Sequence, residues 1–350
     1  MSKALETLWY TRCPVPTSLG IALQRGWLEE AFARQHTSIK SLQESSDVAV
    51  RESHFDHTLQ NSVRHGGNIP AIWARASGRQ TRVVGLSWAD EIQLILTLPG
   101  SGINTVRDLK GRKFGLPLWR NVQIDFARAQ AIRALENALR LEGLEVADVE
   151  LVDFIIERRP SDEPVQRIDG RADLSTSGGS RNAELVGLLR GEVDAIFLKG
   201  AHAAQLVHHF GLQVVIDTGS HPEPLVRSNN GTPRTLTVDQ HLLDQHGDAA
   251  VLLLETTLRA EQWAHGHPLE ARQFLARETN SNDFWVRRAY GEDAHLRLQT
   301  HFSEGNVAAL QDFTNFLHRW GFIPATFDVR DWIAAGPYEQ ASARLHARAA

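Results

Sequence analysis

Segments with the spacing of strands alternate with segments with the spacing of helices along most of this chain. Residues 5–11 predict a first strand, and apolar residues at helical intervals over 16–32 predict a helical stretch with an end at Gly26. A long amphipathic helix is predicted over 123–141 and a short helix over 69–76. Further strands are expected over residues 38–42, 82–86, 93–98, 149–154 and 212–216. This alternation is typical of an α/β protein, in which helices cover the sheet.

Two regions depart from this alternation. Residues 155–182 are rich in charge, glycine and serine, and a loop of that length inside a compact domain is usually a lid or a disordered segment. Residues 239–345 are predicted to be mostly helical. The tryptophans expected to anchor the packing of this helical region are Trp263, Trp285, Trp320 and Trp332.

The length and charge of the chain limit its class and its partners. A chain of 350 residues favours two domains, and a net charge of −5 indicates neither a nucleic-acid nor a membrane partner. The longest apolar runs, such as residues 249–254, are too short to span a bilayer. The first residues lack the apolar core of a signal peptide, and one cysteine suits a reducing compartment, so we expect a cytoplasmic protein.

The single cysteine, Cys13, directly follows the predicted first strand and precedes a Pro-Val-Pro segment. Because proline interrupts a strand, we expect the Cys13 side chain at the exposed end of that strand. A lone cysteine is more often a small buried hydrophobic residue than a nucleophile, so both interpretations stay open at this point. A thiol reacts as its thiolate, which a nearby cation favours; the candidate cations are Arg12, Arg64 and a charged His54.

An arginine and two glycines between positions 64 and 67 offer a site for a small oxyanion. The guanidinium of Arg64 matches two oxygens of one anion with two parallel hydrogen bonds. Gly66 and Gly67 let backbone N–H groups approach the same oxygens without a side chain in the way. The alternatives are a solvated surface arginine and a plain loop before a helix.

Two histidines are placed one helical turn apart. His54 and His57 have a spacing that can ligate a metal ion. No third ligand has a matching spacing, so we expect a surface or core histidine pair and no metal site. The chain also lacks the glycine-rich loop motifs that bind nucleotide phosphates.

Two segments of the chain resemble the second lobe of type II periplasmic-binding-protein folds. They are Asp108-Leu109-Lys110-Gly111-Arg112-Lys113-Phe114-Gly115 and Leu188-Leu189-Arg190-Gly191-Glu192-Val193-Asp194-Ala195. The resemblance is to sulfonate, nitrate and taurine solute-binding proteins and covers most of residues 5–335. It implies an α/β fold of two lobes with a ligand cleft between them, the first formed by residues 1–98 with 219–350 and the second by residues 99–218. Binding proteins and enzymes share this scaffold, so the fold alone does not separate them.

Three motifs in the first lobe resemble the aromatic sulfinate desulfinases of the biodesulfurisation pathway. They are Tyr10-x-x-Cys13-Pro14-Val15-Pro16, His54-Phe55 and Arg64-x-Gly66-Gly67-x-Ile69-Pro70. Enzymes of this family have the same two-lobed fold, convert 2'-hydroxybiphenyl-2-sulfinate to 2-hydroxybiphenyl and sulfite in the cytoplasm, and need no cofactor. The resemblance implies that Cys13, His54 and Arg64 are catalytic. The residues that it implies as substrate contacts are Thr11, Phe55, Gly66 and Gly67.

The chain departs from the family pattern at Arg12, His65 and Asn68, so the resemblance indicates the reaction more firmly than the substrate. The leading hypothesis is a carbon–sulfur hydrolase that releases sulfite from an aryl sulfinate or a related small organosulfur acid. Cys13 acts either as a nucleophile on the sulfinate sulfur or as a proton donor to the ring carbon, and the sequence leaves both routes open. The alternative hypothesis is a non-catalytic binding protein for a sulfonate-like anion, partnered with a transporter.

Overall fold

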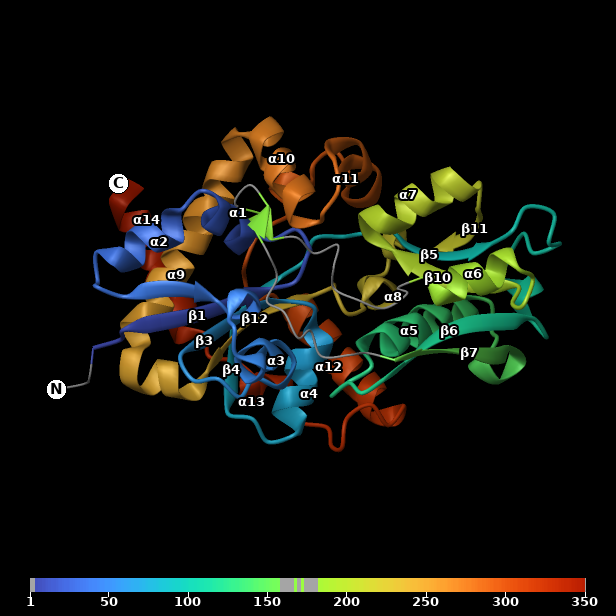
Figure 1. Cartoon of the computed structure of the whole chain (residues 1–350), viewed down its shortest axis with the longest axis horizontal. Helices are drawn as coiled ribbons and strands as arrows, with labels where there is room; N and C mark the ends of the chain where they lie inside the picture. The colour runs from blue at the N-terminus through green and yellow to red at the C-terminus, as the bar shows by residue number, and fades with distance from the viewer. Residues whose placement is uncertain (1–3, 158–166, 169–170, 173–181, 350) are drawn as a thin grey trace.

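The protein contains two five-stranded sheets, each in a lobe of its own, and the two lobes lie side by side along the long axis of the molecule (Figure 1). A two-stranded ribbon is separate from both sheets and consists of β8 (Arg167–Ile168) and β9 (Arg171–Ala172). The predicted α/β class with two lobes is confirmed. The computed structural model describes residues 4–157, 167–168, 171–172 and 182–349.

The first sheet has the strand order β2-β1-β3-β12-β4. Its strands are β1 (Thr7–Arg12), β2 (Ser38–Ser41), β3 (Ser62–Gly66), β4 (Thr81–Ser87) and β12 (Arg234–Asp239). Strand β1 runs parallel to β2 and β3, whereas β12 runs antiparallel to β3 and β4. The carboxyl ends of β1 and β3 therefore meet at one end of the sheet, where Thr11 lies opposite Arg64.

The second sheet has the strand order β11-β5-β10-β6-β7. Its strands are β5 (Gln93–Thr97), β6 (Lys113–Arg120), β7 (Glu150–Glu157), β10 (Ala195–Lys199) and β11 (Gln213–Asp217). Strand β6 runs parallel to β7 and β10, and β5 runs antiparallel to β10 and β11. Because β5 pairs within this sheet, we propose that the second lobe begins before Gln93 rather than after residue 98.

Helices surround both sheets (Figure 1). The helices that precede β11 in the chain are α1 (Ser18–Gln24), α2 (Trp27–Ala33), α3 (Val48–Asp56), α4 (Asn68–Ala76), α5 (Phe126–Leu141), α6 (Ala183–Leu189) and α7 (Gly200–Phe210). The C-terminal ones are α8 (Pro224–Arg227), α9 (Gln240–Gly266), α10 (Pro268–Glu278), α11 (Asp283–Tyr290), α12 (Glu304–Arg319), α13 (Val329–Trp332) and α14 (Gly336–Ala349). Gly26, between α1 and α2, has a φ of 70°, which confirms the helix end predicted there.

Most predicted elements are confirmed, including the mainly helical C-terminal region. The sequence analysis did not predict α3, β3 or β12. Of the four tryptophans expected as packing anchors, Trp285 and Trp332 are buried, and Trp263 and Trp320 pack partly buried against the core. Of the loop predicted over 155–182, residues 158–166, 169–170 and 173–181 lie outside the described residues.

A buried group of charges lies where the chain passes between the two sheets. The Glu91 carboxylate accepts a hydrogen bond of 2.6 Å from Lys199 Nζ and lies 3.9 Å from the guanidinium of Arg234. Burial raises the pKa of Glu91, but the charges of Lys199 and Arg234 outweigh it and hold that pKa below its usual range. A side chain at Gly231 would overlap the Glu91 carboxylate, so the close packing of the chain around these charges requires a glycine at position 231.

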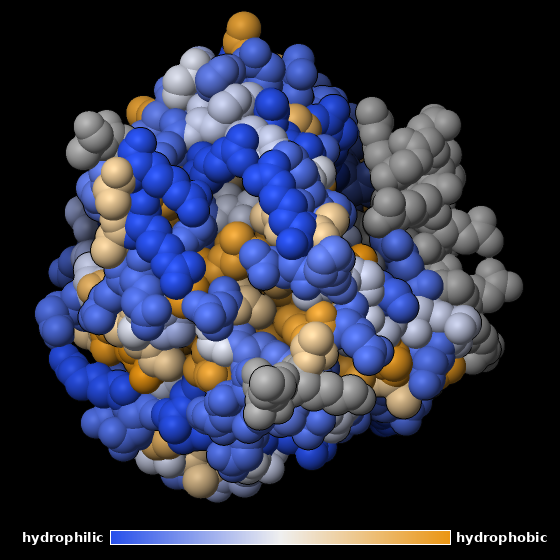
Figure 2. Space-filling view, turned by 90° about the vertical axis from the view of Figure 1, so that its left-hand side faces the viewer, coloured by the Kyte–Doolittle hydropathy of each residue, from blue (hydrophilic) through white to orange (hydrophobic). Residues whose placement is uncertain are grey.

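Figure 2 shows that polar side chains dominate the end of the molecule where both termini lie, with hydrophobic side chains in its centre and in scattered patches below it. Among the described residues, the helices are either too short or too polar to cross a bilayer.

The buried carboxyl group of Glu261, in α9, predicts a pH dependence of stability. Its Oε1 accepts hydrogen bonds from the Ser18 hydroxyl (3.1 Å) and from the backbone N–H of Thr300 (3.0 Å), yet burial raises its pKa to about 7. The folded state therefore binds one more proton than the unfolded state between the ordinary pKa of 4.5 and about 7. This contribution to stability is complete below that window and is lost as the pH rises through it.

The variant Glu261→Gln keeps the shape of the side chain and cannot ionise. Its free energy of unfolding should be close to that of wild type at pH 4 and exceed it by about 3 kcal/mol at pH 8, since each pKa unit corresponds to roughly 1.4 kcal/mol. Urea unfolding at both pH values measures the difference. A difference that does not change with pH would contradict the prediction.

Candidate active site

Strand β1 delivers Cys13 to the end of the first sheet. The backbone N–H of Cys13 donates to the carbonyl of His65 at 3.1 Å, which extends the β1–β3 pairing by one residue. Side chains alternate along a strand, so Thr11 and Cys13 lie on one face of the sheet and Arg12 on the other. Cys13 is partly exposed rather than buried in the core. The position expected at the exposed end of the strand is confirmed, and the interpretation of Cys13 as a core residue is wrong.

The guanidinium of Arg64, on β3, connects the other predicted residues. It donates from Nη2 to the sulfur of Cys13 (3.3 Å), from Nη1 to the carbonyl of Gly67 (2.7 Å) and from Nε to the carbonyl of His54 (3.1 Å). Arg64 is only 3% exposed, so the alternative of a solvated surface arginine is wrong. Burial lowers the pKa of Arg64 and the neighbouring Cys13 opposes that effect. An arginine stays charged at neutral pH under such a shift.

Helix α3 brings His54 to the Arg64 guanidinium through its backbone carbonyl, and Phe55 follows it in the chain. Its end is fixed by His57, which adopts a φ of 54° and donates its backbone N–H to Ser53. His54 Nδ1 and the hydroxyl of Thr11 are joined by a hydrogen bond of 2.7 Å. The Thr11 contact restrains the orientation of the His54 ring.

An aromatic pair extends from His54 toward the second lobe. The Phe55 ring meets the His54 ring edge to face at 4.6 Å between ring centres. On its other side it lies nearly parallel to Phe126, the first residue of α5, with ring centres 6.5 Å apart and planes 14° apart. Phe55 comes from the first lobe and Phe126 from the second, so an apolar surface from both lobes adjoins His54.

The two glycines permit close approaches that larger residues would prevent. A Cβ at Gly66 would overlap the sulfur of Cys13, and a Cβ at Gly67 would lie 2.5 Å from the side-chain oxygen of Asn230. Gly67 also caps the start of α4, and no described residue accepts a hydrogen bond from its backbone N–H. The alternative of a plain loop is wrong for Gly66, which is the last residue of β3.

The residues that depart from the desulfinase pattern do not reach the sulfur. His65 is buried and bonded to Ser87 Oγ at 3.2 Å, and burial together with Arg234 and Arg64 lowers its pKa to about 3. Asn68 donates its amide to the backbone carbonyls of Asn229 (3.0 Å) and Pro233 (2.9 Å). The guanidinium of Arg12 pairs with Glu278 on the opposite face of the sheet. Of the three candidate cations, Arg64 contacts the sulfur of Cys13 directly, and Arg12 is paired elsewhere.

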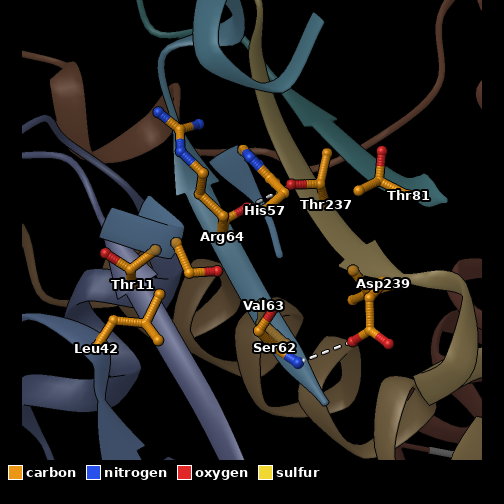
Figure 3. Close-up of a pocket in the computed structure, with 11 residues that line it drawn as sticks. Thr11, Leu42, His57, Ser62, Val63, Arg64, Thr81, Thr237 and Asp239 are labelled. Atoms are coloured by element: carbon orange, nitrogen blue, oxygen red, sulfur yellow. Dashed lines mark hydrogen bonds between the residues drawn. The ribbon is translucent and has the colours of Figure 1, made fainter. Parts of the chain in front are cut away.

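A small cavity lined in part by Arg64 lies inside the first lobe (Figure 3). It is bordered by β3 and β12, and its lining includes Thr11, His57, Thr237 and Asp239 but not Cys13. His57 Nδ1 lies 3.2 Å from the carbonyl of Phe55, and burial and the charge of Arg64 lower the pKa of His57 to about 3. Within the described part of the chain, no three His, Cys, Asp or Glu side chains are grouped so as to hold a metal ion.

Comparison with known proteins finds relatives of the kind that the sequence motifs resemble. The chain is 25% identical over 353 residues to the 2'-hydroxybiphenyl-2-sulfinate desulfinase of Rhodococcus erythropolis, covering 94% of this chain and 92% of the relative. The same identity and coverage hold for the desulfinase of Rhodococcus qingshengii. The chain is a relative of sulfinate desulfinases. No protein-family model matches the chain.

Solved structures of a desulfurization enzyme and of sulfonate-binding proteins have the same fold as this chain. A serine-for-cysteine variant of the desulfurization enzyme DszB, in complex with biphenyl-2-sulfinic acid, matches with a TM-score of 0.72 at 24% identity, covering 97% of this chain and 99% of DszB. The periplasmic aliphatic sulphonate binding protein SsuA from Escherichia coli matches with a TM-score of 0.64 at 18% identity, covering 94% of this chain and 92% of SsuA. The two-lobed binding-protein fold predicted from the sequence is therefore confirmed.

Sequence motifs indicated Cys13, His54 and Arg64, and the structure brings all three together. They did not indicate Phe126 and Asn230, which reach the same region from distant parts of the chain. Asn230 accepts a hydrogen bond from the backbone N–H of Ile69 at 3.0 Å, which holds the start of α4 in place. An asparagine in a turn-rich stretch gives no signal that it contacts a glycine more than 160 residues earlier.

The variant Gly66→Ala tests the packing of the sulfur. The added methyl group displaces the Cys13 side chain and breaks the bond from Arg64, and a hydrogen bond to a charged group contributes about 1.5 kcal/mol. Alkylation of Cys13 by iodoacetamide should therefore slow by about tenfold. Gly247→Ala is the matched control, because a Cβ at Gly247 meets no atom within 4 Å. An unchanged rate in a folded Gly66→Ala protein would contradict the packing.

Proposed function

We propose that this protein is an enzyme that cleaves the carbon–sulfur bond of an aryl sulfinate and releases sulfite. The observation that carries the proposal is the 3.3 Å contact between the buried Arg64 guanidinium and the sulfur of Cys13, beside His54. An aryl sulfinate anion and one water yield an arene and hydrogen sulfite, so atoms and charge balance without an external oxidant or reductant. We therefore assign the reaction to the carbon–sulfur hydrolases and give it no cofactor.

The groups around Cys13 match the charge of a sulfinate. Two N–H groups of Arg64 beyond those already bonded, with the backbone N–H of Gly67, are suited to its two oxygens. Gly67 would then have two functions: its N–H donates to the sulfinate, and its carbonyl accepts a hydrogen bond from Arg64 and holds the guanidinium in place. The sulfinate group is thereby expected to lie against the sulfur of Cys13.

The aromatic side chains favour an aryl substituent on the sulfinate. The rings of Phe55 and Phe126 are nearly parallel and partly buried, and aromatic rings pack well against one another in offset or edge-to-face arrangements. Because the two rings come from different lobes, an aryl group in contact with both would be enclosed between the lobes. We propose that the cleft between the lobes binds the substrate there, shielded from water.

The donor aimed at sulfur supports a nucleophilic role for Cys13. The Nη2–H of Arg64 stabilises a thiolate more than a thiol, and the thiolate is the nucleophile. In this route a bond forms between Cys13 Sγ and the sulfinate sulfur while the carbon–sulfur bond breaks. The aryl carbon takes up a proton from His54 or water, and water then releases hydrogen sulfite and restores the thiolate.

The second route has Cys13 deliver its proton to the ring carbon, after which sulfur leaves as sulfur dioxide and hydrates to sulfite. The two routes differ in a measurable way. The nucleophilic route predicts an adduct of one sulfur dioxide on Cys13 in the intact mass of protein quenched during turnover, whereas the proton-transfer route predicts no adduct. A free thiol also suits a reducing compartment, and the proposal includes a cytoplasmic location.

Sulfite release from an aryl sulfinate tests the function. Wild-type protein should release one sulfite per arene formed, and Cys13→Ser should lower the rate by at least about 10³-fold, since an essential nucleophile is removed. Binding of the aryl sulfinate to Cys13→Ser, measured by calorimetry, should persist because the Arg64 donors remain. Tight binding of aryl sulfonates by wild type without any sulfite release would instead favour a solute-binding protein partnered with a transporter.

A further inference from the structure

Arg12, the residue directly before Cys13, is tied to a distant helix. Its guanidinium forms an ion pair with the carboxylate of Glu278, the last residue of α10. The Arg12 side chain is 22% exposed and that of Glu278 only 3%. Arg12 also lies near the ring of Tyr10, two residues earlier on the same face of β1. The pair therefore holds the end of β1 from the face of the sheet opposite to Arg64.

The carboxylate of Glu278 is tightly packed against helix α1. The second carboxylate oxygen of Glu278 accepts a hydrogen bond of 2.8 Å from the amide of Gln24, in α1. The same amide also donates to the carbonyl of Phe274 at 3.1 Å. A Cβ at Gly20 would lie 2.7 Å from the carboxyl carbon of Glu278, so α1 can approach the carboxylate only because residue 20 is glycine. Both oxygens of Glu278 are thus occupied, one by Arg12 and one by Gln24.

The electrostatics agree with a tight pair. Burial of Arg12 lowers its pKa, but the charge and hydrogen bond of Glu278 outweigh burial and raise the pKa of Arg12 above its ordinary value. A paired guanidinium on the far face of the sheet is directed away from the thiol. Arg12 therefore does not serve as the cation that stabilises the Cys13 thiolate.

The backbone after Arg12 offers few other restraints. Pro14 and Pro16 have no N–H to donate, so the pairing of β1 with β3 ends at the bond from Cys13 N–H to the carbonyl of His65. Val15 donates its N–H to the carbonyl of Cys13 itself at 2.8 Å, which forms a tight turn. The chain that carries the reactive sulfur leaves the sheet at this turn, immediately beyond the Arg12 anchor.

We propose that Arg12 and Glu278 form a positioning pair, which fixes the end of β1 so that the sulfur of Cys13 meets the Arg64 guanidinium. The pair acts through the backbone of Cys13 and does not contact substrate. This inference rests on the proposed function for its effect on turnover, and on geometry alone for its effect on the thiol. It couples the reactive cysteine to helices α1 and α10, on the side of the lobe away from the substrate.

Three variants test the pair: Arg12→Gln, Glu278→Gln and the double variant. In each variant the Cys13 sulfur should be displaced, and kcat for sulfite release should fall by about tenfold to a hundredfold, because a small displacement of a reacting group lowers the rate strongly. KM and the affinity for an inert aryl sulfonate should stay within about twofold, because the Arg64 donors remain. The double variant should be no worse than either single one, and Arg12→Lys should recover part of the loss. Arg34→Gln, which breaks an exposed ion pair with Glu30, is the matched control without effect.

Alkylation of Cys13 by iodoacetamide gives a readout that needs no substrate. As the chain has one cysteine, the rate reports on Cys13 alone. Arg12→Gln and Glu278→Gln should each slow alkylation by about fivefold, since the thiol loses its contact with Arg64. Urea unfolding of each variant, followed by circular dichroism, checks that the protein assayed is folded, so that slower alkylation reports on the position of the thiol. If wild type releases no sulfite while both variants alkylate slowly, the proposed function fails and the positioning pair stands.

Two results would overturn the inference. If Glu278→Gln behaves as wild type while Arg12→Gln is slow, Arg12 acts through its charge and not through its anchor. If both variants alkylate and turn over at the wild-type rate, the end of β1 is held without them.

Discussion

The buried guanidinium of Arg64 is the interaction on which the candidate site depends. A charged group that is 3% exposed must have its hydrogen bonds satisfied, and here the acceptors are two backbone carbonyls and one sulfur. Each acceptor belongs to a different segment: the end of α3, the turn between β3 and α4, and the end of β1. One side chain thus fixes the relative positions of His54, Gly67 and Cys13. None of the three acceptors carries a formal negative charge when the thiol is protonated, which leaves the guanidinium free to attract an anion.

The fold explains why these segments meet. Strands β1 and β3 are parallel neighbours, so the chain leaves both at the same end of the sheet, and ligands of α/β proteins commonly bind beyond the carboxyl ends of such strands. The same framework in sulfonate-binding proteins shows that it accommodates more than one use. Within that framework, the candidate site of this chain is built from local features: a cysteine at the end of β1, a glycine beside its sulfur, and an ion pair on the opposite face of the sheet.

Much of the fold follows from the sequence, because most strands are apolar and most helices have one apolar face. The elements that escaped prediction lack those patterns. Strand β3 contains an arginine and a histidine within five residues, and three of the four apolar residues of α3 are consecutive, so they do not set a helical period. Strand β12 alternates threonine with apolar residues, but is short and follows a turn-rich stretch. Local patterns fail where residues are selected for chemistry or for contacts with distant segments.

The grouping of the three candidate residues was predictable from the sequence, and the residues that support them were not. Motif order indicated Cys13, His54 and Arg64, but Glu278 and Phe126 reach the site only through the tertiary fold. The most direct test is a crystal structure of Cys13→Ser with an aryl sulfinate bound. Both sulfinate oxygens should lie within hydrogen-bond distance of Arg64 or the Gly67 N–H, with the sulfur about 3.5 Å from the hydroxyl that replaces the thiol. A sulfinate bound away from Arg64, or with its oxygens directed to solvent, would contradict the central claim.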